Sequence, residues 1–244
     1  MMYDKLCTEY YDTDKKFAQQ DELKLYQEEF NKNDLLLEPM CGSGRLLIPL
    51  MQLGYTVHGL DNSACMLESC KNRAEKLNLK PILYKNSIED MSLEQKYNGI
   101  IIPFGSFQLL YPRENAYSAL VKFKQLLLPG GKLILDLFIP WSALYENGEV
   151  STGSKEVTLD SGEIIKIKNI STSDKDNQHM LSKSSYTKYD TDNKILAQQD
   201  EQMDILWYYQ FEIELILEKY GFQNIRHVTR FLNGDNLLTF IATV

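Results

Sequence analysis

Residues 35–48 read LLLEPMCGSGRLLI: an apolar run that ends in an acid, a small glycine-containing loop, and a second apolar run. The pattern is typical of a strand that turns through glycines into a helix, and the start of such a helix presents unpaired N–H groups. Gly42 and Gly44 allow a sharp bend and leave no Cβ in the way of a ligand. The stretch therefore predicts a site for a nucleotide-like ligand.

Strands and helices alternate outward from this stretch. The expected strands are 35–38, 55–61, 81–87, 97–104, 132–138, 222–231 and 237–244, and the expected helices are 21–30, 44–54, 63–78, 114–131 and 211–222. Strands that are apolar on both faces and alternate with helices indicate a parallel sheet covered on both sides. We expect an α/β fold of the Rossmann-like, doubly wound kind, with a mostly parallel seven-stranded sheet.

The hydrophobic period changes after Trp141. Residues 155–170 predict a hairpin around Ser161-Gly162, residues 171–178 a polar loop, and residues 181–209 a second hairpin. We therefore expect an antiparallel β insertion over residues 142–206 that covers a substrate pocket. Residues 1–141 and 207–244 would form the main domain.

Composition and charge limit the partners. The formal net charge of −8 over 244 residues argues against a nucleic-acid partner, which usually requires a basic face. The four cysteines form neither a CxxC pair nor a Cys/His metal spacing, so we expect no metal site and free thiols in a reducing compartment. No apolar run approaches the ~18 residues of a membrane span, and the first residues lack the apolar core of a secretory signal. These features predict a cytoplasmic protein.

Three ligands compete for the glycine loop. A phosphate P-loop requires GxxxxGK[ST], which is absent. A dinucleotide site requires GxGxxG, but Leu47 stands at the third glycine. S-adenosylmethionine carries an ammonium and a sulfonium and no phosphate, so Glu38 before the loop favours it, whereas the same acid would repel a pyrophosphate. Asp61, 17 residues after Gly44, ends the next strand and could accept the ribose hydroxyls of either adenosine ligand.

Five segments in order resemble the motifs of the class I S-adenosylmethionine-dependent methyltransferases: LLLEPMCGSGRLLIPL, VHGLDNSACML, SIEDM, YNGIIIPFGSFQLL and LLLPGGKLILDLF. The likeness runs along most of the chain and points to small-molecule enzymes with a β insertion before the last helix. It implies an enzyme, a monomer or homodimer, that transfers a methyl group from S-adenosylmethionine to nitrogen or oxygen of a small-molecule acceptor by in-line displacement.

The resemblance also assigns site residues. The expected cofactor-binding residues are Tyr11, Glu38, Met40, Gly42, Gly44, Arg45, Asp61, Asn62, Met66, Ser87, Ile88, Glu89, Pro103 and Phe104. The expected substrate-binding residues are Ser106, Phe107 and Trp141. A general base is needed only if the nucleophile arrives protonated, and the candidates are His179, in the expected polar loop, and Tyr11, which could also close over the cofactor.

Three residues depart from the family pattern. Met40 stands where the first loop glycine is usual, Ser87 replaces a frequent Asp, and Asn98 replaces a common Asp of the fourth-strand motif. These departures keep open a cofactor-binding module without turnover. A nicotinamide-dependent oxidoreductase is a second alternative. A protein substrate also stays open, whereas the acidic charge and the lack of a [DN]PP[YF] element argue against nucleic-acid amino groups.

Overall fold

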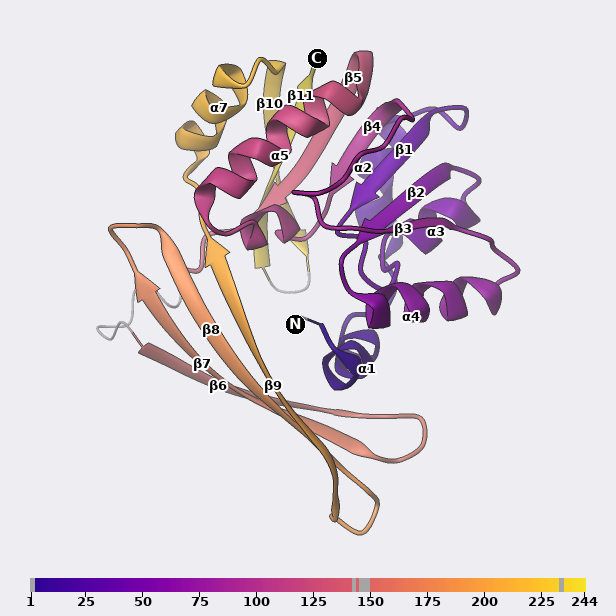
Figure 1. The fold of residues 1–244 in the computed structure, drawn as a ribbon, viewed down its shortest axis with the longest axis vertical. Helices are drawn as coiled ribbons and strands as arrows, with labels where there is room; N and C mark the ends of the chain where they lie inside the picture. Colours follow the sequence, from indigo (N-terminus) through magenta and orange to yellow (C-terminus); the bar gives the residue numbers. More distant parts are fainter. Residues whose placement is uncertain (1–2, 142–143, 145–149, 233–234) are drawn as a thin grey trace.

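The computed structural model describes residues 3–141, 144, 150–232 and 235–244. The chain forms a seven-stranded sheet with helices on its two faces, and a four-stranded antiparallel sheet that extends away from it (Figure 1). In the described ranges, no helix combines the length and the apolar character that a membrane crossing requires.

The seven-stranded sheet confirms the expected fold class. Its strands are β1 (Leu35–Pro39), β2 (Thr56–Asp61), β3 (Ile82–Lys85), β4 (Tyr97–Ile102), β5 (Leu127–Leu137), β10 (Gln223–Leu232) and β11 (Asp235–Thr243). They lie in the order β10-β11-β5-β4-β1-β2-β3. Strands β1 to β5 pair in parallel, and β11 is antiparallel to both β5 and β10. The carboxyl ends of β1, β2 and β4 therefore meet at one edge, where ligands bind in such sheets.

Helices cover both faces of this sheet. They are α2 (Gln20–Glu29), α3 (Leu47–Gln52), α4 (Ala64–Glu75), α5 (Arg113–Leu126) and α7 (Gln210–Lys219), with a 3₁₀ helix, η1 (Ser106–Leu109). Helix α1 (Lys5–Asp14) lies instead between α4 and the four-stranded sheet (Figure 1). Apolar residues of α5 and α7 pack in one core cluster, and those of α2, α3 and α4 in a second. Ser63 caps α4, because its hydroxyl accepts from the backbone N–H of Met66 at 3.1 Å.

The insertion is a sheet of two hairpins. Its strands are β6 (Val150–Thr158), β7 (Ile164–Asp174), β8 (His179–Tyr189) and β9 (Ile195–Leu206), paired in that order. The first hairpin turns at Ser161-Gly162 as expected. The expected loop over residues 171–178 is wrong in its first half, because residues 171–174 end β7. Ser171 and Ser173 are buried on the inner face, and such short hydroxyl residues carry no apolar alternation that would reveal a strand.

Helix α1 was not expected from the sequence. Its buried stripe comprises Leu6, Cys7 and Tyr10, which pack with Ile165 and Tyr186 of the insertion sheet. This stripe is narrow and the rest of the helix is polar, so its periodicity is weak. The helix is thus ordered by contacts with a sheet that lies more than 150 residues later in the chain.

A buried ion pair ties the sheet edge to the end of β4. The carboxylate of Asp136, on β5, accepts hydrogen bonds from Arg230 Nη2 and Thr239 Oγ1, both at 2.6 Å. It also accepts from the backbone N–H of Phe104 at 2.9 Å. One side chain therefore joins β5, β10 and β11 to the first turn after β4.

Replacing Asp136 by Asn tests this network. The change should lower the free energy of unfolding by about 3 kcal/mol, because Arg230 would remain buried without its counter-charge. Arg226→Met is the control: Arg226 pairs with Glu29 at the surface, and its loss should cost about 1 kcal/mol or less. Urea unfolding measures both, and equal losses would contradict the role of Asp136.

Candidate functional site

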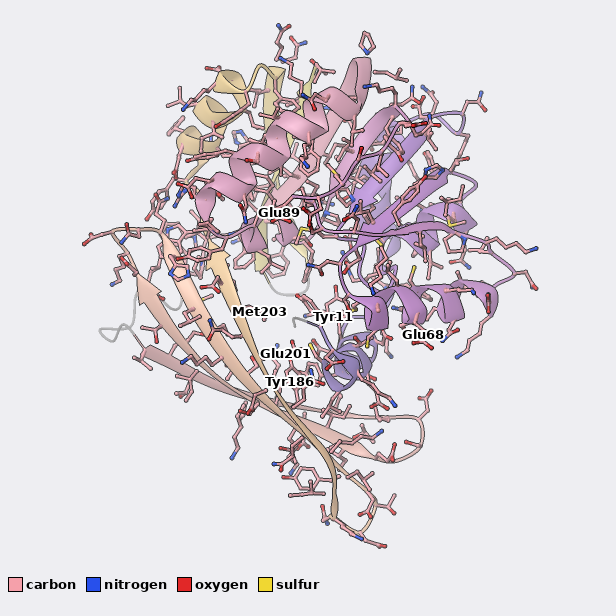
Figure 2. The ribbon with its side chains drawn as sticks, in the orientation of Figure 1. Tyr11, Glu68, Glu89, Tyr186, Glu201 and Met203 are labelled. Atoms are coloured by element: carbon pink, nitrogen blue, oxygen red, sulfur yellow. The ribbon has the colours of Figure 1, made fainter. Side chains whose placement is uncertain are left out.

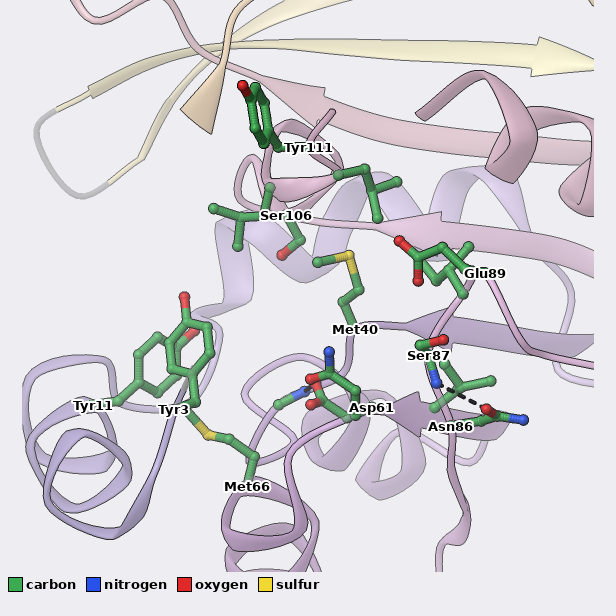
Figure 3. A pocket seen from close by; sticks show the side chains of 16 residues that line it. Tyr3, Tyr11, Met40, Asp61, Met66, Asn86, Ser87, Glu89, Ser106 and Tyr111 are labelled. Atoms are coloured by element: carbon green, nitrogen blue, oxygen red, sulfur yellow. Dashed lines mark hydrogen bonds between the residues drawn. The ribbon is translucent and has the colours of Figure 1, made fainter. Parts of the chain in front are cut away.

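A cavity of about 190 Å³ lies at the carboxyl ends of β1, β2 and β4 (Figure 3). Its walls come from the N-terminal segment and α1, from the loops after β1, β2 and β3, and from η1. The lining residues are Tyr3, Tyr11, Met40, Gly42, Leu60, Asp61, Asn62, Met66, Asn86, Ser87, Ile88, Glu89, Ser106, Leu109, Leu110 and Tyr111. Ten of these were expected at the site from the sequence, and six were not.

The two loop glycines have different roles. A Cβ on Gly42 would meet only Met66 Sδ, at 3.8 Å, so the loop is open to the cavity there. A Cβ on Gly44 would lie 2.6 Å from Cys70 Sγ and 2.9 Å from the side chain of Ile48. Gly44 does not line the cavity; its missing side chain lets α4 pack against the loop. Both glycines have positive φ angles, +53° and +79°.

The carboxylate of Asp61 holds the glycine loop through hydrogen bonds to the backbone. One carboxylate oxygen accepts from the backbone N–H of Gly42 and the other from that of Ser63, both at 2.8 Å. Burial raises the pKa of Asp61, and the backbone donors oppose that shift. Each carboxylate oxygen has a second lone pair, so Asp61 can still accept from a ligand hydroxyl in the cavity.

Glu38, one residue before the end of β1, has an unsatisfied carboxylate; it is not among the residues that line the cavity, but its charge acts on Tyr11 and Asp61, which are. Its residue is 2% exposed, and Oε2 has no hydrogen-bond partner in the part of the chain that the structure describes. Burial raises the pKa of Glu38 well above its ordinary value of 4.5, and the charge of Arg45 opposes the shift. A buried acceptor without a donor is rare in folded proteins and often marks a functional position.

Arg45 forms a buried ion pair within the protein. Its guanidinium makes a two-pronged ion pair with Glu22 on α2, at 2.6 and 2.7 Å, and both side chains are buried. The guanidinium also lies over the ring of Phe104, 4.7 Å from its centroid. Glu38, Arg45, Pro103 and Phe104 were expected to bind a cofactor, but none of the four is among the residues that line the cavity.

Two tyrosines form the wall on the α1 side. The rings of Tyr3 and Tyr11 meet edge to face, with centroids 6.1 Å apart (Figure 3). Burial raises the pKa of both hydroxyls, so both are neutral near pH 7. Tyr11 also feels the charges of Arg45 and Glu38. Tyr3 precedes the helix and was not among the expected site residues, although Tyr3, Tyr10 and Tyr11 form a YxxxxxxYY pattern that resembles the family's N-terminal tyrosines.

The opposite wall holds the residues after β3 and β4. Ser87 does not point a free hydroxyl at a ligand, because Ser87 Oγ donates to Asp90 at 2.9 Å. Its backbone N–H donates to Asn86 Oδ1, also at 2.9 Å (Figure 3). Leu109, Leu110 and Tyr111 were missed because a four-residue 3₁₀ helix leaves no periodic pattern.

Two expected substrate residues lie elsewhere. Phe107 is 1% exposed and packs in the core against Tyr208, with ring centroids 5.8 Å apart. The tight turn of η1 directs Ser106 toward the cavity and Phe107 into the core, so Phe107 does not line the cavity and its contact with a substrate stays a prediction. Trp141 is 47% exposed and does not line the cavity.

His179 is not in a loop. It is the first residue of β8, where Nε2 lies 2.8 Å from Asp204 Oδ1 and the imidazole stacks on Tyr111 with centroids 4.7 Å apart. The β8–β9 register places His179 and Asp204 on one face of the insertion sheet, and Glu201 on the other. His179 therefore approaches the cavity only from behind Tyr111. Glu201, on the opposite face, is buried, at 7% exposed.

Comparison with known proteins agrees with this geometry. Residues 36–131 match a family described as "Methyltransferase domain". The chain contains a class I methyltransferase domain. The family resemblance inferred from the five sequence segments is thereby confirmed.

Individual relatives extend the likeness. A dTDP-3-amino-3,6-dideoxy-alpha-D-glucopyranose N,N-dimethyltransferase from Streptomyces fradiae is 29% identical over 123 residues, which are 50% of this chain and 46% of that protein. The match thus spans less than half the length of this relative.

Two solved structures share the fold. An S-adenosylmethionine-dependent methyltransferase from Clostridium acetobutylicum has a TM-score of 0.74 at 17% identity, covering 100% of this chain and 93% of that one. An amino pentose methyltransferase from Micromonospora echinaspora has a TM-score of 0.72 at 17% identity, covering 100% and 98%. At these identities the likeness concerns the fold alone.

Glu38→Gln should make stability less sensitive to pH. The pKa of Glu38 is higher in the folded than in the unfolded protein, so the folded protein binds more protons at this group above pH 4.5. The free energy of unfolding of the wild type therefore falls as the pH rises above 4.5. The variant should therefore be more stable than the wild type at pH 8 and differ least near pH 4.5, as measured by urea unfolding at both pH values.

Glu28→Gln, on the exposed side of α2, is the matched control and should change the free energy of unfolding by about 0.5 kcal/mol or less at both pH values. A Glu38→Gln protein that is less stable than the wild type at pH 8 would show that the buried carboxylate is satisfied in the folded protein.

Proposed function

We propose that the cavity binds S-adenosylmethionine and that the protein transfers its methyl group to nitrogen or oxygen of a small-molecule acceptor. The observation that carries the proposal is the buried Oε2 of Glu38, an acceptor without a donor at the end of β1. The ammonium of the cofactor's methionine part is the cationic donor that such an oxygen requires.

The other residues fit the same ligand. Gly42 leaves room for close approach, and Asp61 offers lone pairs to the ribose hydroxyls. Met66 and Ile88 supply apolar surface for an adenine ring. Of the described residues that line the cavity, none is Lys or Arg, whereas Asp61 and Glu89 are acidic, and such a lining suits a cationic ligand better than a pyrophosphate. The charge pattern therefore favours S-adenosylmethionine over a nicotinamide cofactor.

The protein's own contribution to the reaction is positioning. The cofactor supplies a methyl group on an already activated sulfonium. The side chains around the cavity hold an acceptor in line with it and keep competing water out. Tyr11 acts here as a hydrogen-bond donor rather than a base, because burial raises its pKa and keeps the phenol protonated. An acceptor with a free lone pair, such as a neutral amine, needs no base.

We place the acceptor under the insertion, residues 142–206. A hollow of about 380 Å³ lies between α1 and the inner face of this sheet, and Tyr10, Lys15, Ser184 and Met203 are among its lining residues. Lys15 Nζ lies 5.4 Å from the ring centroid of Phe104, so the hollow adjoins the end of β4. The named relatives act on amino sugars, which supports a nitrogen acceptor.

The acidic net charge of −8 supports a protein that acts without nucleic acid, and the free thiols of its four cysteines support a cytoplasmic one. A monomer or homodimer stays our expectation for the assembly.

A binding module without turnover is the second candidate, and the structure weakens the case for it. Asn98 Oδ1 accepts from the backbone N–H of Leu35 at 2.9 Å, so this departure serves the sheet rather than the cavity. Met40 adopts φ +60°, the conformation that a glycine would take there. The departures from the family pattern therefore leave the cavity intact.

Isothermal titration with S-adenosylmethionine and with NADH tests the proposal, and Gly42→Ala sharpens it. The wild type should bind S-adenosylmethionine and not NADH. The added methyl group points into the open cavity, so Gly42→Ala should weaken S-adenosylmethionine binding at least tenfold, roughly the cost of one displaced ligand contact.

Gly54→Ala is the control. Its φ of +88° imposes a similar backbone strain, but a Cβ there would meet nothing within 4 Å, and Gly54 lies outside the cavity lining. Binding of S-adenosylmethionine should survive this change. Tight binding of NADH alone, or equal losses of affinity in both variants, would overturn the assignment.

A further inference from the structure

Helix α1 lies between the insertion sheet and the rest of the protein. Figure 2 shows Tyr11 on this helix near Glu201 and Tyr186, which belong to the insertion sheet. No described residue of β6 to β9 lines the cavity of the proposed cofactor, whereas Tyr3 and Tyr11 both do. The described contacts of the insertion with the cavity wall are indirect: they run through α1 and, on the other side, through His179, which stacks on the lining residue Tyr111.

Strand β9 caps the start of α1. Glu201 Oε1 accepts from the backbone N–H of Asp4, and Gln199 Oε1 from that of Leu6, each at 2.9 Å. Gln199 Nε2 donates to Glu201 Oε1 at 2.7 Å, which fixes the pair of side chains together. The first N–H groups of a helix have no partner within it, so these two side chains supply acceptors that α1 lacks. The negative charge of Glu201 also favours the positive end of the helix dipole.

Further contacts on the same side hold the helix along its length. Cys7 Sγ donates to Tyr186 Oη at 3.3 Å, and Lys188 Nζ makes an ion pair with Glu9 at 2.8 Å. Burial raises the pKa of Cys7, so the thiol stays protonated and can donate. Glu201 and Gln199 differ from these contacts, because they bind the backbone of the helix rather than its side chains.

The opposite side of α1 contacts α4. Asp12 forms an ion pair with Arg73 at 3.0 Å and accepts from Ser69. Ser63 Oγ donates to the backbone carbonyl of Tyr3 at 2.7 Å. Since the backbone N–H of Ser63 also donates to Asp61 Oδ1, this contact joins the N-terminal segment to the floor of the cavity.

We propose that Glu201 and Gln199 are positioning residues for the cofactor. By capping α1 from the insertion sheet, they hold Tyr3 and Tyr11 against the cavity. The inference rests on the proposed function for the identity of the cofactor, but not for the contact itself. A ligand that binds the inner face of the insertion and stabilises the docked position of α1 should therefore raise the protein's affinity for the cofactor. By thermodynamic linkage, the bound cofactor should raise the protein's affinity for that ligand by the same factor.

Two alanine variants test the cap. Gln199→Ala and Glu201→Ala should each weaken binding of S-adenosylhomocysteine about fivefold, the effect of losing one helix cap, as measured by isothermal titration. Glu201→Gln keeps an acceptor oxygen and should restore near-wild-type affinity. Gln202→Ala is the control: Gln202 lies on the same strand, is exposed, and faces away from α1. It should change nothing.

A second measurement does not depend on the cofactor. Without ligand, amide hydrogen exchange at Asp4 and Leu6 should speed up in the two alanine variants and stay slow in Glu201→Gln and Gln202→Ala. Gln199→Ala is the milder change, so it keeps the test valid if Glu201→Ala does not fold.

The outcomes separate the two proposals. A wild type that does not bind S-adenosylhomocysteine would overturn the proposed function, while faster exchange in the alanine variants would still support the cap. Unchanged exchange, or unchanged affinity for S-adenosylhomocysteine in a wild type that binds it, would overturn the role of Glu201 and Gln199.

Discussion

Glu38 occupies a central strand of the sheet, at the edge where ligands bind, and its carboxylate is buried with one oxygen unpaired. Burying a carboxylate is costly unless it is hydrogen-bonded and paired. The nearest cation, Arg45, is already held by Glu22, so it lessens the cost of burial without removing it. The surrounding structure repeats this theme: Asp61 lies beside the same loop, and no lining side chain in the described ranges carries a positive charge. These features support the proposal that the site receives a cation.

The sequence predicted the parts of the protein that follow regular patterns. The seven strands, their parallel core and the two insertion hairpins could be predicted because buried strands and amphipathic helices have characteristic periods. Glu38, Gly42 and Asp61 were found because the loop chemistry of the family fixes their places relative to β1 and β2.

The remainder depended on contacts that no local pattern encodes. Helix α1 is ordered by the insertion sheet, and Tyr3 reaches the cavity only because that helix docks. The short helix η1 decided that Ser106 faces the cavity and Phe107 the core. His179, expected in a polar loop, is the first residue of β8, and the register of that strand turns it away from the cavity. A one-residue error in a strand is enough to move a side chain to the other face.

The two sheets thus have different roles at the cavity, and α1 connects them. The parallel sheet supplies the loops that surround the cavity, and the insertion sheet bounds a hollow beside it and caps the helix that closes one wall. This arrangement explains why a segment without a single cavity-lining residue among those described can still matter for ligand binding. In the proposed function, the same arrangement separates the cavity for the cofactor from the hollow for the acceptor.

A crystal structure of the protein with S-adenosylhomocysteine is the most direct test of the central claim. The ligand is predicted to lie in the cavity at the ends of β1, β2 and β4, with its amino group as the missing partner of Glu38 Oε2 and its ribose hydroxyls on Asp61. A ligand bound elsewhere, or a Glu38 carboxylate that keeps its unpaired oxygen in the complex, would contradict the account.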